Sequence, residues 1–78
     1  MIRIYIGIDV GSVSTNVVAV DSSCSVLSKQ YIRNNGQPIE SVKQGLRRLG
    51  QELGNKARVL GVGATGSGRQ LTGILVGA

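Results

Sequence analysis

Residues 7–15 are the part of this chain best suited to bind a ligand. They read Gly-Ile-Asp-Val-Gly-Ser-Val-Ser-Thr, so the carboxylate of Asp9 precedes a glycine and several hydroxyl groups. The hydroxyl side chains are those of Ser12, Ser14 and Thr15. A carboxylate is a hard oxygen ligand for Mg²⁺, hydroxyl and backbone N–H groups donate to phosphate oxygens, and Gly11 lets the backbone come close. The segment therefore fits a hydrated Mg²⁺ beside the phosphates of a nucleotide.

The same residues also fit a simpler interpretation. Asp and Ser side chains commonly accept hydrogen bonds from the backbone amides of turns, so Asp9 and its neighbours could merely stabilise a β-hairpin. The choice between a ligand site and a plain hairpin depends on the elements that surround the segment.

Three β-strands are predicted at the start of the chain. Apolar residues alternate over residues 2–8, which places every second side chain on one face of a strand. These residues are Ile2, Ile4, Ile6 and Ile8. The β-branched run 15–20 and the apolar run 26–32 predict two further strands, because turn residues at 21–25 separate them and Asn-Asn-Gly at 34–36 ends the last. We expect an antiparallel meander.

A helix and a parallel strand are predicted next. Pro38 suits the first helical position, and five apolar residues follow at spacings of three and four, which keeps them on one helical face. They are Ile39, Val42, Leu46, Leu49 and Leu53. Gly45 and Gly50 would each weaken this helix by about 1 kcal/mol relative to Ala. Gly and Asn at 54–55 would end it, and the apolar run 59–62 is typical of a buried parallel strand.

A second glycine-rich segment, residues 63–69, is predicted to connect that strand to a helical turn over 71–76. Residues 61–66 match Gly-x-Gly-x-x-Gly, the pattern of a dinucleotide-binding turn, but that interpretation leaves Asp9 unexplained. The segment is not a Walker A loop, because Arg69 stands where Lys is required. It is either a plain connection or a loop that borders the same cleft or a partner surface, with Thr65, Ser67 and Arg69 as possible contacts.

Composition excludes several classes of protein. With one Cys and no His among 78 residues, the chain alone can build neither an internal disulfide, nor a zinc site, nor a His-based catalytic triad. No apolar run approaches the roughly 20 residues that span a bilayer, so we expect a soluble, cytoplasmic protein without a membrane partner. The net charge of +5 favours anionic partners, but two Tyr offer little for bases to stack on, so we expect no nucleic acid.

Gly7-Ile8-Asp9-Val10-Gly11-Ser12, followed by this order of strands and helix, resembles the first phosphate motif of the acetate kinase, sugar kinase, Hsp70 and actin superfamily. Together with Gly-Ala-Thr-Gly-Ser-Gly-Arg at 63–69, the chain is similar to the ATPase activators of 2-hydroxyacyl-CoA dehydratases and the ATPase subunits of benzoyl-CoA reductase. The resemblance covers the whole chain but only the first part of such a protein. It implies an α/β fold with a ribonuclease-H-like, actin-like mixed sheet, of which residues 1–78 are the truncated N-terminal portion.

The resemblance also implies roles for individual residues. Asp9 would hold Mg²⁺ through water, and the β- and γ-phosphates of ATP would be lined by Gly11, Ser12, Ser14 and Thr15. Proteins of that family are homodimers that bridge one [4Fe-4S] cluster and use ATP hydrolysis to drive an electron into a dehydratase or reductase partner. Cys24 does not fall in the family's cluster motif, so the cluster ligands would lie beyond this chain.

Several expectations follow for the fragment itself. The second phosphate loop and the adenosine site would also lie beyond it, so we expect no catalytic residue here, an inactive fragment and weak ATP binding. An exposed sheet edge would favour a homo-oligomer. Two other interpretations remain open, a non-catalytic binding or scaffold module and a Rossmann-type dinucleotide-binding fragment.

Overall fold

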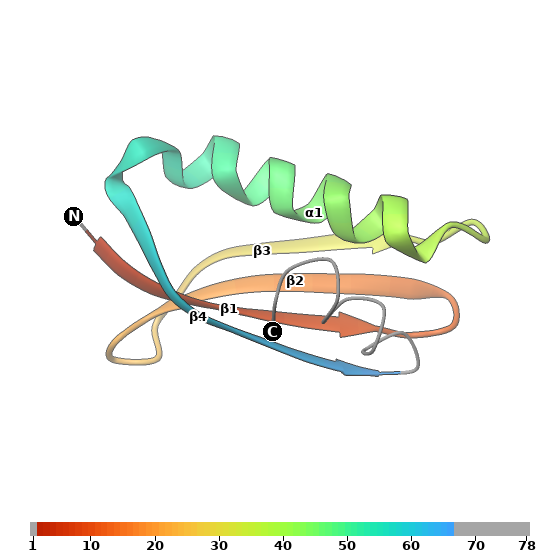
Figure 1. Cartoon of the computed structure of the whole chain (residues 1–78), viewed down its shortest axis with the longest axis horizontal. Coiled ribbons are helices and arrows are strands. Elements are labelled where there is room, and N and C mark those ends of the chain that lie inside the picture. Colours follow the sequence, from red (N-terminus) through yellow and green to blue (C-terminus); the bar gives the residue numbers. More distant parts are fainter. Residues whose placement is uncertain (1, 67–78) are drawn as a thin grey trace.

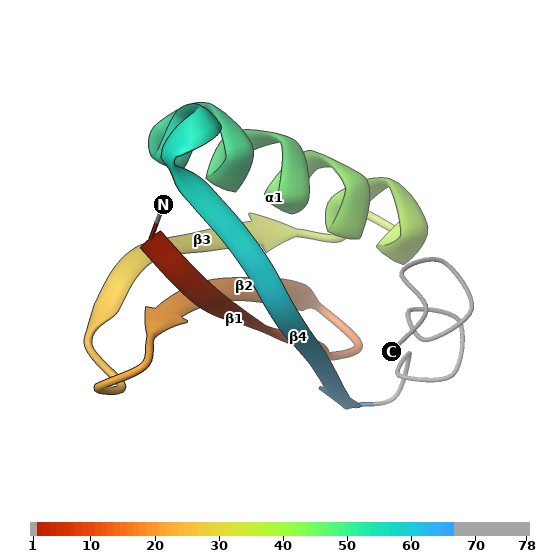
Figure 2. The same ribbon diagram turned by 60° about the vertical axis from the view of Figure 1, so that its left-hand side comes forward.

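Four strands and one long helix make up residues 2–66, the part of the chain that this computed structural model describes. The elements are β1 (Ile2–Val10), β2 (Ser14–Asp21), β3 (Val26–Arg33), α1 (Pro38–Leu53), a short 3-10 turn η1 (Gly54–Lys56), and β4 (Ala57–Gly66). The strand order is β3-β2-β1-β4 (Figures 1 and 2). β2 is antiparallel to both β1 and β3, and β4 is parallel to β1. The predicted meander, helix and parallel strand are therefore confirmed, and the fold is α/β with one mixed sheet and one helix.

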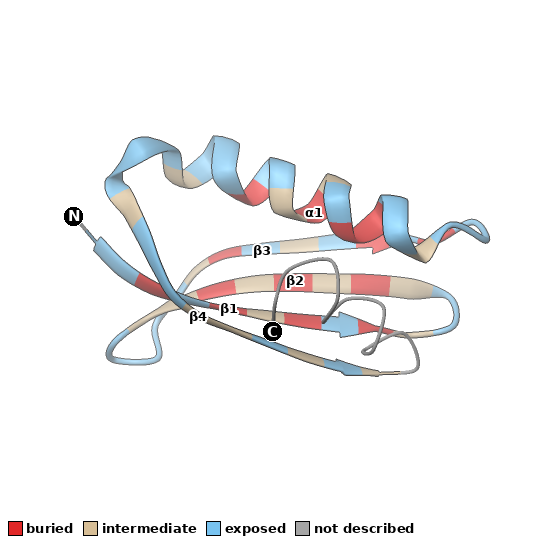
Figure 3. Ribbon diagram, viewed as in Figure 1, coloured by how far each residue is buried: buried red, intermediate tan, exposed pale blue. Residues whose placement is uncertain are grey.

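The core lies between α1 and one face of the sheet, as the buried positions in Figure 3 show. Ile4, Ile6 and Ile8 of β1 are buried, as their alternation predicted, whereas Ile2 at the strand's start is 46% exposed. The strands and the helix add further buried apolar side chains, namely Val10, Val17, Ala19, Val42 and Leu49. Because successive residues of a strand point to opposite faces, the strand residues that alternate with the buried ones lie on the face of the sheet that α1 does not cover.

The helix packs mainly over β2 and β3, and it approaches β2 closely at Gly45. A Cβ atom at this position would lie 2.6 Å from Cγ2 of Val17, which is closer than real Cβ contacts allow. The glycine that lowers the helix propensity of this segment is therefore required by the packing. Ile39, which was expected on the buried face, is 42% exposed near the helix start.

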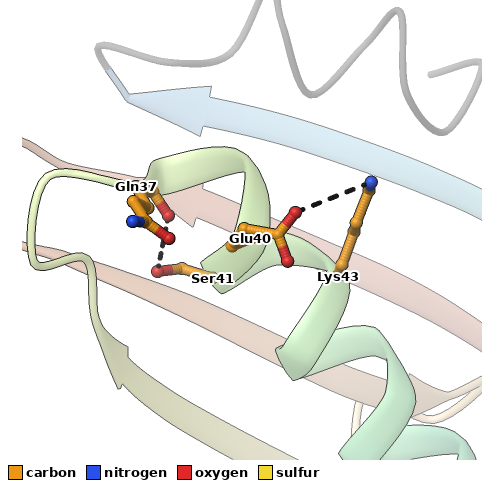
Figure 4. Close-up of polar contacts among 4 residues, drawn as sticks. All are labelled: Gln37, Glu40, Ser41 and Lys43. Atoms are coloured by element: carbon orange, nitrogen blue, oxygen red, sulfur yellow. Dashed lines mark hydrogen bonds and ion pairs between the residues drawn. The ribbon is translucent and has the colours of Figure 1, made fainter.

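The first turn of α1 is tied to the chain that precedes it (Figure 4). Pro38 occupies the first turn, and the buried Ser41 hydroxyl donates a 3.2 Å hydrogen bond to the backbone oxygen of Gln37. This contact satisfies a polar group that would otherwise be costly to bury. The ion pair between Lys43 and Glu40, at 3.8 Å, is exposed and contributes little to stability.

β4 is longer and more exposed than the sequence predicted. It continues through Gly63 to Gly66, where a loop was expected, because its backbone stays paired with β1 along this whole stretch. Val59 is 50% and Leu60 44% exposed, since within the described residues β4 lies at the sheet edge and α1 covers mainly β2 and β3. Leu60 is the extra residue of a β-bulge.

The described part of the chain has no helix that is both long and apolar enough to cross a membrane. The helical turn predicted over residues 71–76 lies outside the described residues.

Candidate functional site

A hollow lies on the sheet face opposite α1, over the carboxyl-terminal halves of β1 and β4. Its volume is about 430 Å³. The residues that line it are Gly7, Ile8, Asp9, Asn16, Val18, Gly63, Ala64 and Thr65. Gly7 pairs with Gly63 across the two parallel strands, so neither of these two positions projects a side chain into the hollow. The carboxyl ends of parallel strands are where ligands bind in open α/β sheets.

Asp9 lies at one end of this hollow with its side chain exposed. Ile8 and Val10 on either side of it are buried beneath α1, so the alternation of β1 places the carboxylate on the open face. Across the sheet, Asp9 pairs with Asn16 of β2 and with Thr65 of β4. The sequence predicted a strand over residues 2–8 with Asp9 directly after it, whereas β1 continues through Val10, so Asp9 lies inside the strand.

The Thr65 hydroxyl donates a hydrogen bond of 3.1 Å to Oδ1 of Asp9. The sequence placed Thr65 in a loop, with contact to the cleft as one possibility; the structure places it on β4, beside the carboxylate. A donor on Oδ1 restricts the rotation of the carboxylate, which would otherwise be a mobile exposed side chain. Ser67 and Arg69, the other two possible contacts of that segment, lie outside the described residues.

Gly66 ends β4 beside the same carboxylate. Its φ of +92° is a conformation that residues with a side chain rarely adopt. A Cβ atom here would lie 2.3 Å from the backbone oxygen of Val10 and 2.8 Å from Oδ1 of Asp9. Only glycine therefore lets β4 close against this part of β1.

The turn between β1 and β2 carries the other predicted binding residues. The Gly11 N–H donates to the backbone oxygen of Ser14 at 2.9 Å, which closes the turn. A Cβ on Gly11 would lie 3.3 Å from that oxygen, so a glycine suits the close approach of the two ends. Ser12 is exposed and Ser14 is half-buried. The turn thus presents one exposed and one partly covered hydroxyl residue, and neither they nor Gly11 are among the residues that line the hollow.

Thr15 does not fit the direct phosphate contact that the resemblance implied. Its side chain is fully buried, and its hydroxyl donates a 2.7 Å hydrogen bond to Oδ1 of Asn34. Thr15 pairs with Val10, whose buried side chain lies on the α1 side of the sheet, so alternation turns both away from the hollow. The hydroxyl supports the structure beneath the turn and does not reach a ligand above it.

Asn34 is the residue of this region that sequence reasoning missed. It was expected only to help end the third strand, but it is buried and reaches back to the β1–β2 turn. Its Nδ2 donates to the Gly11 oxygen at 2.8 Å, and its backbone N–H donates to the Val13 oxygen at 2.8 Å. Asparagine is common in loops for many reasons, so its residue type carried no signal of this contact.

Cys24 lies exposed in the turn between β2 and β3, at the opposite end of the sheet from the β1–β2 turn. The carboxylate of Asp21 organises this turn, because it accepts hydrogen bonds from the N–H groups of Ser23 and Ser25 at 2.9 and 3.0 Å. Neither Cys24 nor Asp21 belongs to the hollow around Asp9.

The Asp9 carboxylate is a donor of the kind that Mg²⁺ takes. Within residues 2–66, no three Cys, Asp or Glu side chains gather as a metal site would require. Mg²⁺ usually keeps several water ligands and takes one or two carboxylates together with phosphate oxygens. A single exposed carboxylate at the edge of a hollow meets that requirement.

The dinucleotide-binding interpretation lacks its structural context here. A Rossmann turn leaves the strand at its first glycine and opens a helix, whereas Gly61, Gly63 and Gly66 all lie within β4.

Comparisons with protein-family models and with curated proteins find no match for this chain.

Proposed function

We propose that this chain is the N-terminal part of an ATPase with a ribonuclease-H-like, actin-like fold, and that it binds Mg-ATP at the hollow around Asp9. The observation that carries the proposal is the exposed Asp9 carboxylate at the carboxyl end of β1, held by Thr65 and next to the β1–β2 turn. The order of elements, a three-stranded antiparallel meander followed by a helix and a parallel strand, also agrees with it.

In this proposal the residues of the chain divide into two groups. Asp9 holds Mg²⁺ through water, with its carboxylate oriented by Thr65. Gly11, Ser12 and Ser14 line the β- and γ-phosphates, while the buried Thr15 acts beneath them. When bound, Mg²⁺ neutralises part of the charge of the phosphate oxygens. The contribution of the protein is electrostatic and positional, since no general base or nucleophile is required from these residues.

The specific biological role is proposed from the resemblance in residues 7–12 and 63–69. The parent protein, of which this chain is the first part, is an activator that couples ATP hydrolysis to electron transfer into a 2-hydroxyacyl-CoA dehydratase or benzoyl-CoA reductase. It acts as a homodimer that bridges a [4Fe-4S] cluster. Such a cluster takes four cysteine thiolates, and this chain has one cysteine, exposed and remote from the hollow. The present residues do not fit the cluster, so its ligands are supplied elsewhere in the parent protein.

The openness of the hollow bears on affinity. Charged groups that face bulk water interact more weakly than groups in a closed cleft, because solvent screens them. Asp9 and Thr65 are both exposed in residues 2–66. We therefore expect tight Mg-ATP binding only in the parent protein, where a second domain closes the cleft, and weak binding by this chain alone.

The replacement Asp9→Asn in the parent protein tests the proposal. It removes the charge that attracts Mg²⁺ but keeps the shape of the side chain, so Mg²⁺-dependent ATP hydrolysis should be lost while the protein stays folded. Glu40→Gln is the matched control, because it removes the same charge from an exposed position on α1. Unchanged ATP hydrolysis in the Asp9→Asn protein would reject the ATPase assignment and favour a scaffold.

A further inference from the structure

We propose that Asn34 is a positioning residue that holds the phosphate-binding turn in its binding conformation before the nucleotide arrives. This inference rests on the proposed function for its ligand, but the conformational part concerns the turn alone. Asn34 lies just after β3, more than twenty residues from Gly11 in sequence, and contacts the turn from its buried side.

Three hydrogen bonds join Asn34 to the β1–β2 hairpin. The side-chain amide donates to the Gly11 oxygen at 2.8 Å, and the backbone N–H donates to the Val13 oxygen at 2.8 Å. The side-chain oxygen accepts from the Thr15 hydroxyl at 2.7 Å. Thr15 is fully buried and Asn34 is 5% exposed, so water does not compete for the bond between their side chains, whereas the bond to Gly11 is partly buried. Bonds of this kind, made inside the protein, hold their groups in one arrangement.

Peptide planarity extends the effect of these bonds to the donors of the turn. The carbonyl of one residue and the N–H of the next lie in one plane and point in opposite directions. Asn34 fixes the carbonyls of Gly11 and Val13, so the N–H groups of Ser12 and Ser14 must point away from Asn34. These two residues are the ones proposed to contact phosphate. Asn34 therefore sets the direction of both backbone donors without touching the ligand.

The chemistry of the contact requires an amide side chain. Asparagine donates and accepts through one short side chain, and here it donates to Gly11 while it accepts from Thr15. Aspartate is nearly the same size but has no donor when ionised, and it would place a negative charge against the Gly11 carbonyl. Asn34→Asp thus keeps the backbone contact and breaks the one to Gly11.

The first experiment compares Asn34→Asp with Asn35→Asp in the parent protein. Asn35 is the exposed neighbour, so the control has the same change in residue and charge. We expect the KM for Mg-ATP to rise about tenfold in Asn34→Asp, the effect of losing one partly buried hydrogen bond, and to change less than about twofold in Asn35→Asp. Hydrogen exchange at residues 11–14 of the nucleotide-free protein should be faster in Asn34→Asp, with residues 4–8 unchanged.

A second pair of variants tests the other side-chain contact of Asn34, the hydrogen bond that it accepts from Thr15. Thr15→Val keeps the shape but removes the hydroxyl donor, whereas Thr15→Ser keeps the donor. We expect Thr15→Val to raise the KM and to speed exchange in the turn, and Thr15→Ser to behave as the unchanged protein does. A double variant of Thr15→Val with Asn34→Asp should show less than the sum of the two effects, because the two bonds that they remove hold the same side chain of residue 34 in place.

The outcomes separate the two proposals. Unchanged exchange in the turn of both Asn34→Asp and Thr15→Val overturns the positioning role, even if the parent protein hydrolyses ATP. Faster exchange throughout β1 and β2 also overturns it, because Asn34 would then serve general stability. Faster exchange confined to residues 11–14, in a protein that binds no Mg-ATP at all, supports the hold on the turn and rejects the proposed ligand.

Discussion

The hydroxyl of Thr65 donates a hydrogen bond to the carboxylate of Asp9 across two parallel strands, at 3.1 Å between Oγ1 and Oδ1. The two residues are 56 positions apart in sequence. They meet because the chain passes from the meander through α1 and returns as β4 parallel to β1, which aligns the carboxyl ends of the two strands. The carboxylate thus depends on the crossover as well as on its own hairpin.

Under the proposed function, Thr65→Val should reduce Mg²⁺-dependent ATP hydrolysis about fivefold, because Asp9 loses the donor that orients it. Valine has the same shape and suits a strand, and the lost bond is exposed, so the free energy of unfolding should change by less than about 1 kcal/mol. Steady-state kinetics and urea denaturation measure the two quantities. Thr65→Ser, which keeps the hydroxyl, should retain most of the activity; equal losses in both variants would assign the effect to packing.

The backbone of this fold is largely predictable from local patterns. The alternation through Ile4, Ile6 and Ile8 gave β1, and the spacing of Val42 and Leu49 gave α1, because burial on one face imposes a period on the sequence. The extent of β4 was not predictable in this way. Residues 63–66 contain two glycines, which favour a loop, yet they pair with β1 because backbone hydrogen bonds need no side chains.

The candidate site was predictable only where its chemistry is local. Asp9 and its neighbours stand together in the sequence, so a carboxylate beside hydroxyl residues could be recognised. The direction of the Thr15 side chain depends on which face of β2 meets α1, and the contact of Asn34 depends on two loops meeting. Neither property belongs to a short segment, so both required the structure.

Gly66→Ala should destabilise the chain by about 2 to 4 kcal/mol, because the position has a positive φ and the added methyl group would meet the Val10 oxygen at 2.3 Å. Gly63→Ala is the matched control, since a Cβ there has no atom within 4 Å, and its effect should stay within about 1 kcal/mol. Chemical denaturation followed by circular dichroism gives both values. Equal stabilities of the two variants would show that β4 does not close against Asp9 and Val10 as described.

Gly45→Ala and Gly50→Ala should change stability in opposite directions although both exchange a helical glycine for the best helix former. At position 50 the methyl group meets nothing within 4 Å, so helix propensity should stabilise the protein by about 0.5 to 1 kcal/mol. At position 45 it would lie 2.6 Å from Val17, and the strain of moving α1 off β2 should exceed that gain and leave a net loss of about 1 to 2 kcal/mol. Thermal or urea unfolding of the two single variants checks the sign. A stabilised Gly45→Ala protein would mean that α1 lies farther from β2 than this packing requires. The buried layer beneath the Asp9 hollow would then also be less tightly packed than described.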